Sequence, residues 1–158
     1  MQIADTPGAS KRLRRTLGRS HAYVQQTFRT PLQELASFTE TVIAAHAPLE
    51  SGSVTVEQVV FTPTNLQALL TSHKLPPNYG RDWTITAAGP EEITALLEAA
   101  WSDALDFYFT PTPRRFHLFA DHDEYTTIFA PTKGQVSKLA TALTGAGFSR
   151  VDGYEREL

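Results

Sequence analysis

"FHLFADHDEYTTIFA", residues 116–130, decides the fold predicted for this chain. Two runs rich in aromatic and β-branched residues stand on either side of four polar residues, Asp121 to Glu124. Such runs favour strands, and Asp favours turns because its carboxylate can accept hydrogen bonds from nearby backbone N–H groups. The stretch therefore predicts a β-hairpin whose turn is the acidic segment.

The segments around the hairpin predict a larger unit. Residues 83–88 alternate like a strand, and residues 89–92, Gly-Pro-Glu-Glu, are a strong helix start. Residues 107–113 are extended and interrupted by Pro, which suggests a short edge strand. A second helix follows the hairpin, and residues 149–157 form the last strand. The order β-α-β-β-α-β over about 83–157 is a ferredoxin-like unit, an α+β antiparallel sheet with two helices on one face.

The N-terminal part predicts a pair of helices. Leu13, Leu17, Val24 and Phe28 fall on one stripe of a helix over about 10–28. A second helix over 30–46 begins at Thr30-Pro31, with a capping box completed by Gln33. A strand at 54–61 and a short helix carrying Leu66, Leu69 and Leu70 follow. We therefore expect a helical section over residues 1–50 and an α+β body over 51–158, with a single compact domain as the alternative.

The charge of the chain is distributed unevenly. Its 158 residues have a net charge of −3, but the first 30 hold six basic residues against Asp5 alone, a net +5, and the remainder is −8. A basic N-terminal arm on an acidic body indicates what the protein could bind, not how it folds. No apolar run approaches the roughly 18 residues that a membrane span needs. We expect a soluble, cytoplasmic protein; a targeting role for the Arg-rich N-terminus, which loosely resembles a mitochondrial presequence, is the alternative.

The acidic turn has two interpretations. A divalent cation could bind there, since carboxylates and an imidazole are common ligands, and the candidates are Asp121, His122, Asp123 and Glu124. However, successive strand residues point to opposite faces, so adjacent acids rarely converge on one ion. The chain also lacks cysteine, phosphate-binding loops and the spacing of calcium or zinc motifs. We favour the plain turn, and we assign no metal, no cofactor and no catalytic residue.

Both faces of the hairpin are apolar, so the sheet needs a cover on each side. A three-residue loop would place His117, Phe119, Tyr125, Thr127 and Phe129 on one face, with Phe116, Leu118, Ala120 and Ile128 on the other. A two-residue loop would shift this register by one and change the partners. Exposed apolar faces usually mark interaction sites. The second face is therefore covered by the same chain, forms an interface or serves as a ligand platform. The run 114–121 does not match the RNA-recognition pattern, so we do not expect sequence-specific nucleic-acid binding.

These patterns favour a non-catalytic accessory or interaction protein that self-associates or docks onto a larger assembly. The predicted contact residues are on the basic helix and the apolar sheet face: Arg12, Arg15, Arg19, Phe119, Tyr125 and Phe129. The basic stripe could also make a weak contact with a polyanion. The alternative is a small enzyme or small-molecule-binding protein with a pocket between sheet and helices. It would use His117, Tyr125, Asp121 and Glu124, with Arg114 or Arg115 as an anion anchor.

Overall fold

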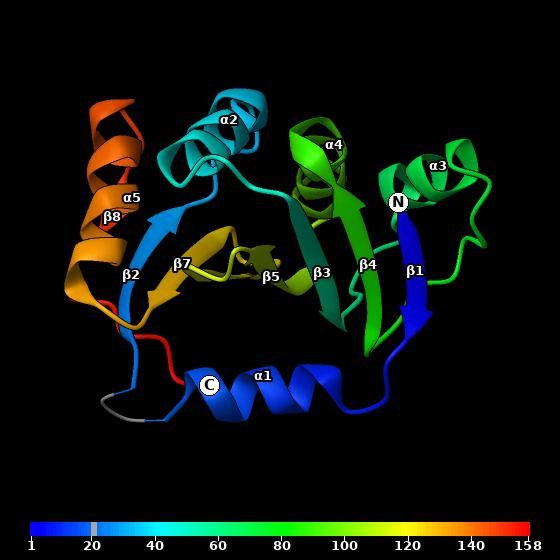
Figure 1. Ribbon diagram of the computed structural model, residues 1–158, viewed down its shortest axis with the longest axis horizontal. Coiled ribbons are helices and arrows are strands. Elements are labelled where there is room, and N and C mark those ends of the chain that lie inside the picture. The colour runs from blue at the N-terminus through cyan, green and yellow to red at the C-terminus, as the bar shows by residue number, and fades with distance from the viewer. Residues whose placement is uncertain (20–21) are drawn as a thin grey trace.

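The computed structural model describes residues 1–19 and 22–158 and is an α+β fold built on one antiparallel sheet (Figure 1). The sheet has eight strands in the order β1-β4-β3-β5-β6-β7-β2-β8. The strands are β1 (Gln2–Asp5), β2 (Val24–Arg29), β3 (Ser51–Gln58), β4 (Trp83–Ala88), β5 (Asp106–Thr112), β6 (His117–Ala120), β7 (Tyr125–Ala130) and β8 (Arg150–Val151). The helices are α1 (Ala9–Leu17), α2 (Leu35–Ala45), α3 (Thr64–Ser72), α4 (Gly89–Ser102) and α5 (Lys133–Gly145).

The helices cover the two faces of the sheet unequally. In Figure 1, α2, α3, α4 and α5 lie on one side, and α1 crosses the opposite side alone. The main core lies between the sheet and the larger helical layer and includes Phe38, Trp101 and Phe109. A smaller apolar cluster lies under α1 and consists of Leu17, Tyr108, Phe119 and Phe129, with Leu13, Tyr23 and Leu158 packed against it. The second apolar sheet face is thus covered by the chain's own residues.

The hairpin has the three-residue loop that separates the two predicted face sets. Phe119 pairs with Thr127 and Leu118 with Ile128, and the Asp121 N–H donates to the Tyr125 carbonyl at 3.1 Å. The loop is therefore residues 122–124. One predicted face set belongs to the main core: Phe116, Leu118, Ala120 and Ile128. From the other set, Phe119 and Phe129 belong to the cluster under α1.

The predicted N-terminal helical pair does not form. The first helix ends at Leu17, and residues 24–29 are strand β2, which pairs with β7 on one side and β8 on the other. Residues 20 and 21 of the predicted helix lie outside the described residues. Val24 and Phe28 are four positions apart, a spacing that places two side chains on one face of a strand as well as of a helix. The second helix begins at Leu35 rather than at Thr30, whose hydroxyl instead hydrogen-bonds that of Thr126 at 2.7 Å.

The ferredoxin-like unit is also not reproduced, because strands from the N-terminal half enter the sheet. β3 lies between β4 and β5, and β2 lies between β7 and β8. The segment 107–113, predicted at an edge, is the central strand β5, paired with β3 and β6. The helices predicted after 89 and after the hairpin are α4 and α5, whose apolar faces pack on the sheet as expected. The last strand is limited to Arg150 and Val151.

Candidate functional site

Helix α1 turns a row of cations outward. Lys11, Arg12 and Arg15 on the helix and Arg19, two residues after its end, are exposed, whereas Leu13 and Leu17 point to the sheet. Arg12 donates to the Pro7 carbonyl at 2.9 Å. Among the described residues, none of these four cations lies within 4.0 Å of a carboxylate. Their charges are therefore not neutralised by direct pairing within this chain.

The start of α1 is held by a carboxylate from a distant segment. Asp82 accepts hydrogen bonds from the N–H groups of Gly8 and Ser10, both at 2.9 Å, and from the Ser10 hydroxyl at 2.6 Å. It thus satisfies donors at a helix start that has no capping side chain of its own. The Ser10 hydroxyl, together with these backbone donors, lowers the pKa of Asp82 below its ordinary value. This contact fixes one end of α1 to the segment just before β4.

Arg14 differs from its neighbours because it turns toward the sheet. It forms an ion pair with Glu57, and Arg81 lies 3.1 Å from the same carboxylate oxygen. Glu57 sits at an irregularity in the β3–β5 pairing, where the register shifts between Val56 and Gln58. Such bulges re-aim a side chain, and here the side chain goes under α1. The second oxygen, Oε2, is buried and has no hydrogen-bond partner within the described chain.

A cavity of about 380 Å³ lies between α1 and the sheet. Tyr108 of β5 is fully buried beside it, and its hydroxyl is closed off from solvent with the Arg14 guanidinium close by. Burial raises the pKa of this hydroxyl, and the nearby Arg14 guanidinium acts in the opposite direction. The lining residues are Arg14, Asp106, Tyr108, Phe119, Asp121, His122, Asp123, Arg156, Glu157 and Leu158.

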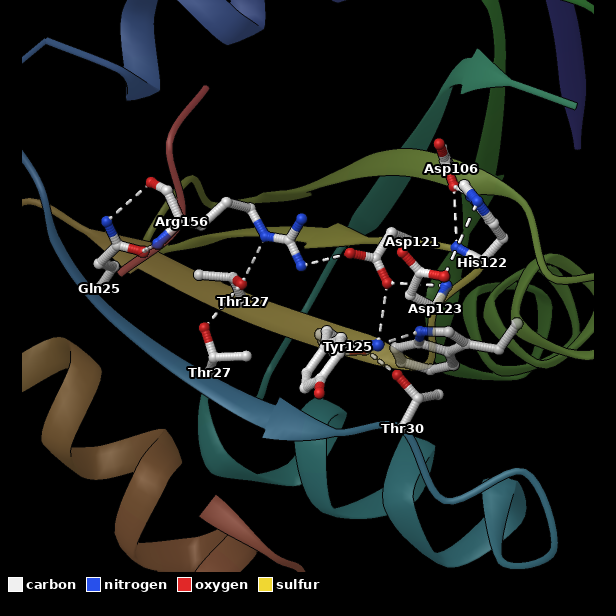
Figure 2. Close-up of polar contacts among 12 residues, drawn as sticks. Gln25, Thr27, Thr30, Asp106, Asp121, His122, Asp123, Tyr125, Thr127 and Arg156 are labelled. Atoms are coloured by element: carbon white, nitrogen blue, oxygen red, sulfur yellow. Dashed lines mark hydrogen bonds and ion pairs between the residues drawn. The ribbon is translucent and has the colours of Figure 1, made fainter. Parts of the chain in front are cut away.

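The acidic turn that the sequence singled out forms one wall of this cavity, and Figure 2 shows its polar contacts. Asp121 accepts from the N–H groups of Asp123 at 3.1 Å and Tyr125 at 3.0 Å, which is the turn geometry expected of Asp. Its other oxygen accepts from Arg156 at 2.5 Å, and the Arg156 Nε donates to Thr127 at 2.8 Å. The Asp121 carboxylate is therefore fully engaged in structure.

His122, the next residue of the turn, pairs with Asp106 at the start of β5. Asp106 accepts from the backbone N–H of His122 and lies 2.8 Å from its Nδ1 (Figure 2). The hydrogen bond to Asp106 raises the pKa of His122 above its ordinary value. Asp123 lies 3.9 Å from Nε2. Across residues 1–19 and 22–158, no group of three or more His, Cys, Asp or Glu side chains is placed to hold a metal ion.

The other predicted residues do not meet in one pocket. His117 is buried and hydrogen-bonds Thr110 at 2.9 Å, whereas Tyr125 stacks on Tyr154 with ring centroids 5.5 Å apart. Along the hairpin, Tyr125 lies four residue steps from His117, a distance of about 13 Å. Arg114 is exposed at the far end of β6 and Arg115 is half-buried there.

Several residues of the site were not anticipated from the sequence: Arg14, Glu57, Arg81, Asp106, Tyr108 and Arg156. Glu57 gave the clearest usable signal, because it alternates with Val54 and Val56 in an otherwise apolar run and so belongs to the opposite face of the strand. An acid on a strand that is buried on both faces needs a partner. The sequence does not say that this partner is an arginine forty-three positions earlier.

No family model matches the chain, and neither a curated protein nor a solved structure shows significant similarity to it. No helix in the described part of the chain is long and apolar enough to cross a membrane.

Proposed function

We propose that this protein is a cytoplasmic, non-catalytic interaction protein that docks onto an acidic protein surface through the outer face of α1. The observation that carries the proposal is the row of four exposed cations, Lys11, Arg12, Arg15 and Arg19, without carboxylate partners in the described chain. The remainder of the molecule is acidic overall. A basic surface on an acidic body orients the molecule toward an acidic partner during approach.

The anchoring of α1 supports this role. Asp82 holds its first turn, the ion pair between Arg14 and Glu57 holds its middle, and Leu17 packs on the sheet near its end. Because the helix is already fixed, the backbone that carries the cations loses little freedom on binding.

The apolar sheet face, by contrast, is not a contact surface in this proposal. Phe119 and Phe129 are buried under α1 and hold it in place, so in this conformation they do not meet a partner.

The charge of α1 favours one of the two forms of association expected from the sequence. Pairing α1 with α1 of a second copy would bring like charges together, which is unfavourable at an interface. Docking onto a different, acidic protein would instead bring opposite charges together, which is favourable. We therefore favour a heterologous partner over self-association.

The test is native mass spectrometry of the protein purified gently, at low ionic strength, from its own host. The informative variant carries Arg12→Glu, Arg15→Glu and Arg19→Glu. A matched control carries the same change in charge on exposed residues of other elements: Lys74→Glu, Lys133→Glu and Lys138→Glu. We expect the wild type and the control to retain a partner's mass and the α1 variant to lose it. A complex that survives in the α1 variant, or is lost equally in both, would contradict the proposal.

A further inference from the structure

We propose that the groove beneath α1 is a binding site for an extended, arginine-bearing peptide segment of another protein, and that the chain's own residues 153–158, the C-terminal segment, fill it in this structure. After β8 the chain turns at Gly153, which has φ 70°, and passes to the side of the sheet that α1 covers (Figure 1). The site lies under α1 and takes a basic ligand, so it is separate from the outer face of the helix. The groove residues that contact the segment include Gln25, Phe119, Asp121 and Thr127.

The groove holds the guanidinium of Arg156 by three different contacts. Asp121 accepts a hydrogen bond from its Nη2 at 2.5 Å, and Thr127 accepts one from its Nε at 2.8 Å (Figure 2). The guanidinium carbon lies 4.8 Å from the centroid of the Phe119 ring. A carboxylate, a hydroxyl and an aromatic face together match the charge, the fixed donors and the flat surface of a guanidinium. The pocket is therefore selective for arginine.

The arginine pocket is organised by contacts that do not involve the C-terminal segment. The Asp121 carboxylate is oriented by the backbone N–H groups of Asp123 and Tyr125. The Thr127 hydroxyl lies 2.8 Å from that of Thr27, and both threonines are fully buried. These groups keep their positions when the arginine leaves. A second arginine would therefore find the same acceptors already in place.

The backbone of the C-terminal segment is held by a side chain rather than by a strand. The Gln25 amide donates to the Arg156 carbonyl at 3.1 Å and accepts from the Arg156 N–H at 2.9 Å (Figure 2). Within the described part of the chain, no backbone-to-backbone hydrogen bond holds residues 153–158. The segment is thus bound as a peptide ligand is bound, and it can leave without breaking a sheet hydrogen bond. Because Gln25 contacts only backbone groups, it can hold a peptide of another sequence in the same way.

Cavities lie on both sides of the C-terminal segment. One has a volume of about 520 Å³ and the other, described above, about 380 Å³. Arg156, Glu157 and Leu158 line both of them. The segment is therefore the wall between two cavities, and its departure would join them into one groove between α1 and the sheet. A groove of this extent suits an extended peptide better than a compact small molecule.

The C-terminal segment also indicates the sequence of the ligand. Tyr154 stacks on Tyr125, Arg156 enters the pocket, and Leu158 packs on the cluster under α1, whereas the glutamates between them are exposed. This two-residue alternation is that of an extended chain with one side on the protein. The ligand should therefore carry an aromatic residue, an arginine and an aliphatic residue at every second position.

The experiment uses two synthetic peptides and the full-length chain. The first peptide is N-acetylated and has the sequence of residues 152–158, and the second has citrulline, a neutral group of similar shape, in place of its arginine. Binding is measured by calorimetry and by amide chemical-shift changes on the variant Arg156→Ala, whose pocket is vacated. We expect the arginine peptide to bind at least tenfold more tightly than the citrulline peptide, with shifts on β2, the hairpin and α1.

The wild type tests whether the C-terminal segment occupies the same site. It should bind the arginine peptide at least tenfold more weakly than Arg156→Ala does, because a tethered segment competes at an effective concentration on the order of millimolar. Arg114→Ala is the matched control, since it removes an exposed arginine at the far end of β6 and should bind like the wild type.

The stability of Arg156→Ala gives a second measurement if this variant folds poorly. A ligand that binds only the folded chain shifts the equilibrium toward it, so the arginine peptide should raise the melting temperature of the variant and the citrulline peptide should not. The proposal is overturned if the arginine peptide neither binds nor stabilises the variant, or if the citrulline peptide acts equally well. It is also overturned if the wild type binds as tightly as the variant, or forms a dimer that Arg156→Ala dissociates, since the occupant would then be the segment of a second copy.

Discussion

His117 should make the stability of this protein fall in mildly acidic solution. Its side chain is 3% exposed on β6, hydrogen-bonded to Thr110 and in edge contact with the ring of Tyr23. Burial, helped by the positive charge of Arg114, lowers the pKa of His117 from 6.5 to about 4. Between about pH 6.5 and pH 4, His117 therefore stays mostly neutral in the folded protein, whereas in the unfolded chain it is mostly protonated.

The sign and size of the effect follow from this difference. Below pH 6.5 the unfolded chain takes up a proton at His117 while the folded chain does not, so stability is highest above pH 6.5 and is lost as the pH falls toward 4. The full difference in pKa corresponds to about 3 kcal/mol, since each pKa unit is worth about 1.4 kcal/mol. Between pH 7.5 and pH 5 the loss should be about 2 kcal/mol, because His117 of the unfolded chain is then mostly protonated.

The assay is urea unfolding of the wild type and His117→Gln at both pH values. The variant loses the ring contacts and will be less stable at neutral pH, but it lacks this titration. The difference in free energy of unfolding between the two proteins should therefore shrink by about 2 kcal/mol at pH 5. His46 and His122 titrate in both proteins, so their contributions cancel in the comparison. A difference that stays constant with pH would refute the reasoning.

Three further substitutions test other parts of the structure. Arg156→Ala leaves Asp121 unpaired at a site where both side chains are about one-tenth exposed, and calorimetric unfolding should show a loss of about 3 kcal/mol. Arg156→Lys should not restore it, since Lys cannot reproduce the forked contact; full recovery would argue against that geometry. Gly52→Ala would push a methyl group into the buried ring of Phe109 and should cost about 1–3 kcal/mol in urea unfolding, whereas a neutral effect would mean that the ring moves freely. Glu124→Gly should stabilise the turn by up to about 1 kcal/mol, because residue 124 has φ 63°, and a loss of stability would contradict this.

The parts of the fold that could be predicted are those fixed by local patterns. The hairpin and the two helices α4 and α5 follow from alternation, turn residues and 3.6-residue periodicity within short segments, whereas the length of the hairpin loop does not. β2 could not be predicted in this way, since Val24 and Phe28 share a face in either conformation and the choice is made by pairing with β7, about a hundred positions later. The insertion of β3 beside β5 is a non-local pairing of the same kind.

The residues of the candidate site also divide into those that local patterns predict and those that depend on contacts between distant segments. The acidic turn was correctly predicted to be a turn, because the hydrogen bonds of Asp121 are local. The exposed positions of Arg12 and Arg15 on α1 were also visible from helical spacing, whereas Arg19 lies beyond the end of the helix. The polar contacts beneath α1 could not be predicted from the sequence. Arg14, Glu57 and Tyr108 come from three distant segments and are brought together only by sheet register and a bulge.

The measurement that tests the proposed docking most directly is zero-length carbodiimide cross-linking of the protein with the partner it retains. This chemistry joins a lysine amine to a carboxylate in direct contact, and the chain has four lysines: Lys11 on α1, Lys74 just after α3, and Lys133 and Lys138 on α5. If an acidic partner docks on the outer face of α1, mass spectrometry should find partner peptides joined to Lys11 and not to the other three. Links from Lys74, Lys133 or Lys138 with none from Lys11 would contradict the proposal.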